Sequence, residues 1–159
     1  MPGPLPLLPN AAVKPHDQRR QVNLITEFFE TLSPDSLKHL ASIYAPHAYF
    51  KDPFNEVRGL TAVEGIFSHM FRALEKPRFL ITESLVDNDQ CFLTWDFEFY
   101  FKTLDRTSLQ TVRGGSHLKL TADGLIYFHR DYWDAAEELY EKLPVVGRLM
   151  RWLKERVKQ

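Results

Sequence analysis

The spacing of hydrophobic residues changes once along the chain, at Pro77. Upstream of it, apolar residues recur every three or four positions, as in Val22, Ile25 and Phe29, which is typical of amphipathic helices. Downstream, long segments rich in aromatic and β-branched residues indicate strands at 78–86, 90–101, 108–120 and 125–133. Helices followed by such a meander predict an α+β fold, in which the N-terminal helices pack in the concave face of one curved, mixed or antiparallel sheet.

Capping and proline signals divide the first half of the chain. The expected elements are a helix at 17–32, a second helix that Ser33 and Pro34 begin and Pro46 ends, a strand at 47–52, a loop at 55–59, and a helix that opens with a capping box at 61–64 and ends at Pro77. In the second half, Gly114 and Gly115 lie inside a predicted strand. Glycine there indicates a bulge or a sharp bend, as a cone-shaped sheet needs.

A length of 159 residues predicts one domain, which we place at 16–143. Residues 1–15 are expected to be a flexible, proline-rich N-terminal tail. Residues 144–159 form an apolar face opposite a basic one, which predicts an amphipathic helix. We expect this helix to pack on its own domain or on a partner, and contact with a membrane surface is the alternative.

Composition narrows the class of protein. A net charge of -1 gives no basic surface for nucleic acid. The single cysteine, Cys91, cannot form an internal disulfide and indicates a reducing compartment. No apolar run reaches about 18 residues, and no basic segment with an apolar core resembles a signal peptide. We therefore expect a soluble, cytoplasmic protein that needs neither a metal nor another cofactor, because its histidines are scattered and it has no glycine-rich phosphate loop.

Two acids end predicted strands. Asp131 lies where a strand passes into a helix, and Asp52 ends another strand before Pro53. Acids held at strand ends can act as general acid and base if they meet in one cavity. His129 is on the same strand face as Asp131, and Tyr49 is near Asp52, so both are candidate catalytic helpers. In the alternative reading, Asp131 pairs with Arg130 or caps the helix, and Asp52 is a turn residue.

The strand at 90–101 has two contrasting faces. Asp96 and Glu98 share one face, and four aromatic residues share the other. The acids either line a pocket, where crowding would raise the pKa of at least one of them, or face solvent. The aromatic residues of this strand suit the interface of a homodimer.

Two segments resemble a known family. Residues 50–53, Phe-Lys-Asp-Pro, with Gly-Leu-Thr-Ala-Val at 59–63, are similar to the segment of ketosteroid isomerase that carries its catalytic base. Residues 130–134, Arg-Asp-Tyr-Trp-Asp, resemble the segment of limonene epoxide hydrolase whose first Asp activates water. With the order of elements over about residues 17–143, they identify the chain as a member of the nuclear-transport-factor-2-like superfamily, in its SnoaL-like branch. The resemblance implies a cone-shaped fold with an apolar pocket.

The chain departs from these relatives at three matching positions. Phe28 replaces a Tyr of the isomerase's oxyanion hole, Ser116 lies near the position of its protonated Asp, and Asp96 takes the place of an Arg of the epoxide hydrolase. The residues expected to contact substrate are Asp96, Glu98, Phe50, Phe28, Ser116, Tyr127 and Trp133. The resulting hypothesis is an isomerase, cyclase or hydrolase that acts on a small apolar molecule. The alternative is a non-catalytic module that binds a small ligand or another protein.

Overall fold

The computed structural model describes residues 15–103 and 106–138. Its elements, in chain order, are α1 (Pro15–Glu30), the 3-10 helix η1 (Ser36–Ser42), β1 (Tyr44–Lys51), β2 (Glu56–Arg58), α2 (Leu60–Ala73), β3 (Leu74–Asp87), β4 (Gln90–Phe101), β5 (Gln110–Leu120), β6 (Ile126–Tyr132) and α3 (Ala135–Glu138). The predicted terminal tail and the amphipathic helix at 144–159 lie outside the described residues, apart from Pro15. No described helix is both long and apolar enough to cross a membrane.

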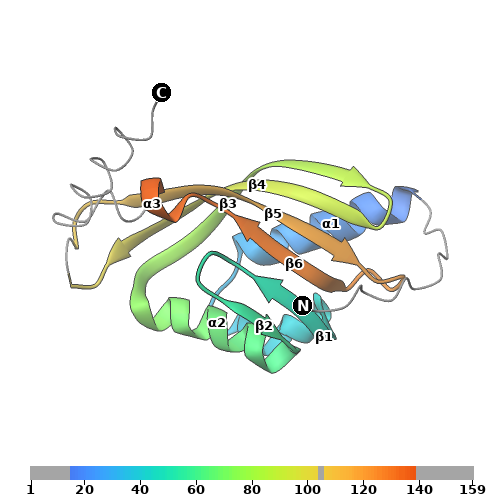
Figure 1. Ribbon diagram of the computed structural model, residues 1–159, viewed down its shortest axis with the longest axis horizontal. Helices are drawn as coiled ribbons and strands as arrows, with labels where there is room; N and C mark the ends of the chain where they lie inside the picture. The colour runs from blue at the N-terminus through green and yellow to red at the C-terminus, as the bar shows by residue number, and fades with distance from the viewer. Residues whose placement is uncertain (1–14, 104–105, 139–159) are drawn as a thin grey trace.

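The six strands form one sheet in the order β2-β1-β6-β5-β4-β3. All neighbours are antiparallel except β1 and β6, which run parallel, so the sheet is mixed. Helix α1 packs on β3, and α2 packs on β1 and β3. Figure 1 shows the sheet arching over α2, with α1 behind. The α+β class predicted from the sequence is confirmed.

The main core fills the space between the helices and the sheet. Val22 and Ile25 of α1 and Val63 of α2 are almost completely buried against strand residues. A smaller cluster of Trp95, Phe99 and Val112 lies apart from this core. The separation matters because it leaves room for a cavity between the two clusters and α2.

The segment around Pro46 differs from the prediction. The second helix was expected to continue to Pro46, but η1 ends at Ser42 and strand β1 begins at Tyr44. Proline is tolerated in this strand because the register with β6 is irregular between Tyr44 and Tyr49, so no ladder bond from its nitrogen is needed. The burial of Tyr44 and Ala48 in the core favours a strand over a helix in this segment.

Two further boundaries were wrong. The predicted loop at 55–59 contains the short strand β2, and α2 begins at Leu60 with Gly59 as its N-cap, without a side-chain cap. The expected capping box at 61–64 therefore lies inside the helix. At its other end α2 stops at Ala73, and β3 runs through Pro77, where the register with β4 is interrupted between Glu75 and Arg78.

Gly114 and Gly115 do not form a bulge, which was one of the two features predicted there; the sharp bend stays a prediction. The pairing of β5 with β4 is unbroken along this segment. Their role is close approach: a Cβ on Gly114 would lie 2.4 Å from the ring of Trp95, and one on Gly115 would lie 2.6 Å from the ring of Phe92. The absence of side chains at these two positions lets large rings of β4 lie flat over β5.

Candidate functional site

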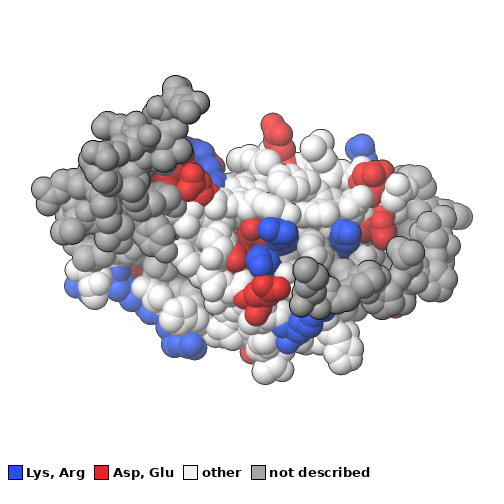
Figure 2. Space-filling view, viewed as in Figure 1, with Lys and Arg blue, Asp and Glu red and all other residues white. Residues whose placement is uncertain are grey.

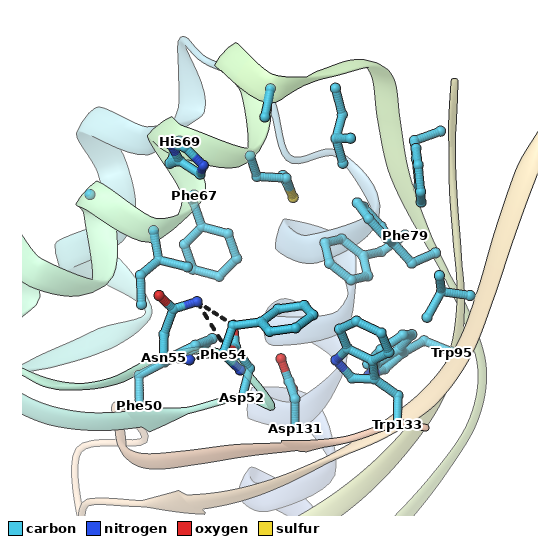
Figure 3. Close-up of a pocket in the computed structure, with 18 of the residues that line it drawn as sticks. Phe50, Asp52, Phe54, Asn55, Phe67, His69, Phe79, Trp95, Asp131 and Trp133 are labelled. Carbon is cyan, nitrogen blue, oxygen red and sulfur yellow. Dashed lines mark hydrogen bonds between the residues drawn. The ribbon is translucent and has the colours of Figure 1, made fainter. Parts of the chain in front are cut away.

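A cavity of about 550 Å³ lies between helix α2, the turn that joins β1 to β2, and the sheet. This volume is in the range of small-molecule sites. Its wall is mostly apolar and includes Phe67 and Met70 of α2, Phe79 of β3, and Trp95, Phe97 and Phe99 of β4. Figure 3 shows these rings surrounding a few polar groups.

Asp131 projects from β6 into this cavity (Figure 3). Its Oδ1 accepts a hydrogen bond from Oγ of Ser116 at 2.5 Å and one from Nε2 of His129 at 2.7 Å. The side chain is 15% exposed, and its Oδ2 makes no hydrogen bond with a described residue. Because each carboxylate oxygen accepts about two bonds, Oδ1 is filled and Oδ2 remains for a ligand.

A buried chain of hydrogen bonds continues from His129 into the core. Oη of Tyr44 lies 2.5 Å from Nδ1 of His129, and both side chains are buried. If His129 gives the proton of Nε2 to the bond with Asp131 and the ring is the neutral tautomer, its Nδ1 accepts from the phenol of Tyr44. Burial, and then the charge of Asp131, hold the pKa of Tyr44 well above its ordinary value. The phenol of Tyr44 therefore keeps its proton, and its contact with Nδ1 holds the orientation of the His129 ring.

Ser116 lies behind Asp131. The two residues are direct neighbours across the β5–β6 ladder. The indole Nε1 of Trp95 donates to Oγ of Ser116 at 2.8 Å, and Ser116 gives its own hydroxyl proton to the bond with Asp131. A small space of about 20 Å³ adjoins Ser116, His129 and Asp131, enough for about one water molecule.

Asp52 also lines the cavity, but its carboxylate is engaged in a turn. Its Oδ1 accepts from the backbone N–H groups of Phe54 and Asn55 at 2.7 and 2.6 Å. The amide Nδ2 of Asn55 donates to both carboxylate oxygens, at 3.1 and 3.0 Å. The bonds match the turn reading of Asp52, and they hold the β1–β2 turn at the edge of the cavity beside Asp131 (Figure 3).

Two predicted substrate contacts do line the cavity. Phe50 is buried at its floor, and Trp133 stands at its edge. The ring of Trp133 packs edge-to-face on Phe54, with centroids 5.4 Å apart. Phe54 is 53% exposed, so this pair forms a partly open wall of the cavity.

Asp96 and Glu98 are on the opposite face of β4 and do not line the cavity. Glu98 forms an ion pair with Arg78 at 2.5 Å, and Asp96 lies 3.9 Å from Arg113. The aromatic residues of β4 turn inward because they can be buried there without losing hydrogen bonds to water. A homodimer whose interface includes the aromatic residues of β4 stays a prediction. These rings line the cavity, so they are not available on the outer face of the sheet.

Three other candidates lie outside the cavity. Tyr49 is on the outer face of β1 and donates to Glu56 at 2.9 Å. Phe28 packs against the core, whereas its neighbour Phe29 approaches the small space beside Asp131. Tyr127 does not line the cavity either; partial burial, and then the charge of Asp89, raise its pKa.

Several wall residues were missed from the sequence. Trp95, Phe97 and Phe99 share the aromatic face of β4. The sequence shows this alternation, but it does not show which face of the strand points into the fold. Tyr44 gave no local signal, because it meets His129 only through the pairing of β1 with β6. Within the described ranges, no group of three or more His, Cys, Asp or Glu side chains is arranged to hold a metal ion.

Comparisons with known proteins agree with this architecture. The model of the SnoaL-like domain family matches residues 25–129. No curated protein matches the sequence. Three solved structures superimpose well. A candidate SnoaL-like polyketide cyclase from a Jannaschia species has a TM-score of 0.66 at 12% identity, covering 80% of this chain and 94% of that chain.

The second is an LEH-like epoxide hydrolase from M. tuberculosis, with a TM-score of 0.65 at 13% identity and coverage of 87% of this chain and 98% of that one. The third is a hypothetical protein from Catenulispora acidiphila, of ketosteroid isomerase-like fold and in complex with trimethylamine. Its TM-score is 0.64 at 14% identity, over 73% of this chain and 88% of that one. At such identities the likeness shows the fold alone, and it confirms the fold that the resemblance implied.

Proposed function

Because the chain belongs to the SnoaL-like domain family, we propose that its cavity binds a small, mostly apolar molecule and that Asp131 transfers a proton to or from it. The observation that supports this most is the position of one carboxylate in an aromatic cavity, with Oδ1 held by two donors and Oδ2 left for a ligand. A base fixed in this way needs no reorganisation when it reacts.

The proposed step is a simple proton transfer. Oδ2 of Asp131 takes a proton from a C–H group of the bound molecule, and the electron pair of that bond moves into the molecule. Return of the proton to another carbon gives an isomerase. If the carbanion instead attacks a carbonyl carbon of the same molecule, a ring closes, the C=O electron pair moves to oxygen, and that oxygen takes the proton from Asp131, which gives a cyclase. If Oδ2 instead takes the proton of a water molecule, the water oxygen bonds to a substrate carbon, the bond from that carbon to an ether or epoxide oxygen breaks, and the released oxygen takes the proton from Asp131; the outcome is hydrolysis. In each case Ser116 and His129 keep the carboxylate oriented.

Asp52 has a different role in this proposal. Its carboxylate accepts four hydrogen bonds within the β1–β2 turn, so it positions Phe54 at the cavity and takes no proton. The two acids were expected from the sequence to act together as acid and base. We assign the proton transfer to Asp131 alone.

A reactive probe tests the proposal without knowledge of the substrate. The probe 5-nitrobenzisoxazole opens to a coloured phenolate when a base removes its ring proton. We expect the protein to accelerate this reaction well beyond the same concentration of acetate, because the carboxylate is held in an apolar cavity. Asp131→Asn should lose the acceleration, and Asp96→Asn, on the outer face, should keep it. A wild-type rate equal to that of acetate would contradict a general base at Asp131.

A non-catalytic ligand-binding module is the second candidate. It is favoured by the engagement of Asp52, because among the described lining residues only Asp131 then keeps a carboxylate oxygen without a hydrogen bond, and there is no second acid to complete a pair. The two candidates separate in the same experiment: a binding module takes up the probe without converting it.

A further inference from the structure

The charges that line the cavity are unbalanced. Asp52 and Asp131 are acidic, and among the described lining residues there is no Lys or Arg. The remaining titratable lining residue is His69, which is exposed on α2. An apolar cavity that holds negative charge without a matching cation is electrostatically costly unless a ligand supplies the positive charge.

The outer surface shows the opposite pattern. Figure 2 shows acidic and basic side chains next to one another on the face in view. Two acids outside the cavity have close cationic partners: Glu56 pairs with Lys51 at 2.7 Å, and Glu98 pairs with Arg78 at 2.5 Å. The groups that bond to Asp131 are instead a serine hydroxyl and the imidazole of His129, and no Lys or Arg of the described residues pairs with it. Asp131 differs from solvated surface acids because its side chain is only 15% exposed and lies in a mostly apolar cavity.

The walls around Asp131 have the complementary property. Indole and phenyl rings carry a negative face, which attracts an organic cation within about 6 Å of the ring centre. Trp95 and Trp133, the stronger of these ring types, both line the cavity together with Phe54 and Phe79. In Figure 3 these four rings and Asp131 surround the same space. Rings and a carboxylate together favour a cation over a neutral molecule of the same shape.

We infer that the ligand of this cavity is an organic cation: an amine or quaternary ammonium group joined to an apolar body, with the positive charge beside Oδ2 of Asp131. Of the proposed function, this requires only that the cavity is a ligand site. The inference adds the charge of the ligand, which the proposed function did not specify. Asp131 then serves as the anionic anchor whether or not it also takes a proton.

A matched pair of probes tests the inference. Benzyltrimethylammonium and neopentylbenzene have the same shape and differ in one atom, nitrogen for carbon, which carries the charge. Binding can be followed by the fluorescence of Trp95 and Trp133, which line the cavity. We expect the cation to bind at least about tenfold more tightly than the neutral isostere, since a partly buried ion pair and ring contacts both act on it.

Two variants assign the preference to the cavity. Asp131→Asn keeps the shape of the side chain and should bring the two affinities within about threefold of each other, whereas Asp96→Asn should leave the preference unchanged. Continued binding of neopentylbenzene shows that the variant is folded. If the neutral probe binds wild type as tightly as the cation does, or if Asp131→Asn keeps the full preference, the inference is wrong.

Failure of this inference and failure of the proposed function give different results. Cation preference without acceleration of 5-nitrobenzisoxazole leaves a binding site for amines and removes the proton transfer. Acceleration without cation preference leaves the proton transfer and removes the amine.

Discussion

Nε2 of His129 lies 2.7 Å from Oδ1 of Asp131, two residues further along the same strand. Alternate residues of a strand share a face, so the strand itself sets this contact. Tyr44 fixes the other side of the imidazole through the neighbouring parallel strand. The orientation of the acid thus depends on sheet pairing and not on a loop.

Removal of the Tyr44 hydroxyl should destabilise the fold. In Tyr44→Phe the Nδ1 of His129 loses its buried partner, and we expect the free energy of unfolding to fall by about 1–3 kcal/mol. Tyr49→Phe is the matched control, because Tyr49 bonds to exposed Glu56 and should cost less than about 1 kcal/mol. Urea denaturation measures both; equal losses would show that the buried bond contributes nothing particular.

Gly114 and Gly65 should respond in opposite directions to the same substitution. A methyl group on Gly114 meets the Trp95 ring at 2.4 Å, so Gly114→Ala should destabilise by about 1–3 kcal/mol and shift tryptophan emission. Gly65 lies within α2 with nothing within 4 Å of an added Cβ, so Gly65→Ala should stabilise by about 0.5–1 kcal/mol. Thermal unfolding of the two variants checks the signs, and stabilisation by Gly114→Ala would contradict the packing described.

Asp52 should tolerate Asn better than Ala. Asn keeps an oxygen that accepts from the backbone N–H groups of Phe54 and Asn55, whereas Ala removes both of these bonds. We expect Asp52→Ala to lose about 1 kcal/mol or more of unfolding free energy and Asp52→Asn to lose less. Both are measured by urea denaturation. If Asp52→Asn keeps the fold but abolishes turnover of 5-nitrobenzisoxazole, Asp52 is itself a reacting group and its assignment to the turn is incomplete.

Cys91 should be inert in the folded protein. Burial raises the pKa of its thiol to about 12, so at pH 8 the reactive thiolate is nearly absent. A chromogenic disulfide reagent should react quickly in denaturant and very slowly without it. The thiol of the unfolded chain ionises above about pH 9, whereas the buried thiol of the folded protein stays protonated. The free energy of unfolding should therefore fall as the pH rises from 9 toward 12. Rapid native-state reaction would contradict the burial.

The class of fold could be predicted because periodicity reports burial directly. The four long strands and the helix with Val22 and Ile25 follow from it. The boundaries at Pro46 and Pro77 could not be predicted. Proline ends a strand only where its missing N–H group would have formed a hydrogen bond to the neighbouring strand. Both prolines lie at interruptions of the sheet register, which arise from tertiary contacts.

The candidate site was predictable only in part. Asp131 and His129 are two residues apart, so their shared face was visible in the sequence. The faces of β4 were also visible, but the choice between Asp96 and Trp95 as the inward residue depends on where the helices lie. Asp52 shows the limit most clearly: the sequence allowed both turn and cavity, and the structure gives it both.

Strand β6 lies between β1 and β5, although it is the last strand of the described chain. During synthesis, the five other described strands leave the ribosome before β6, and β1 and β5 cannot be joined through it until it follows. Strand β6 carries Asp131, so this carboxylate enters the cavity only when β6 joins the sheet. A nascent chain that stops before β6 exposes two unpaired strand edges, which are the surfaces most prone to aggregation. The same strand therefore completes the sheet and places Asp131 in the cavity.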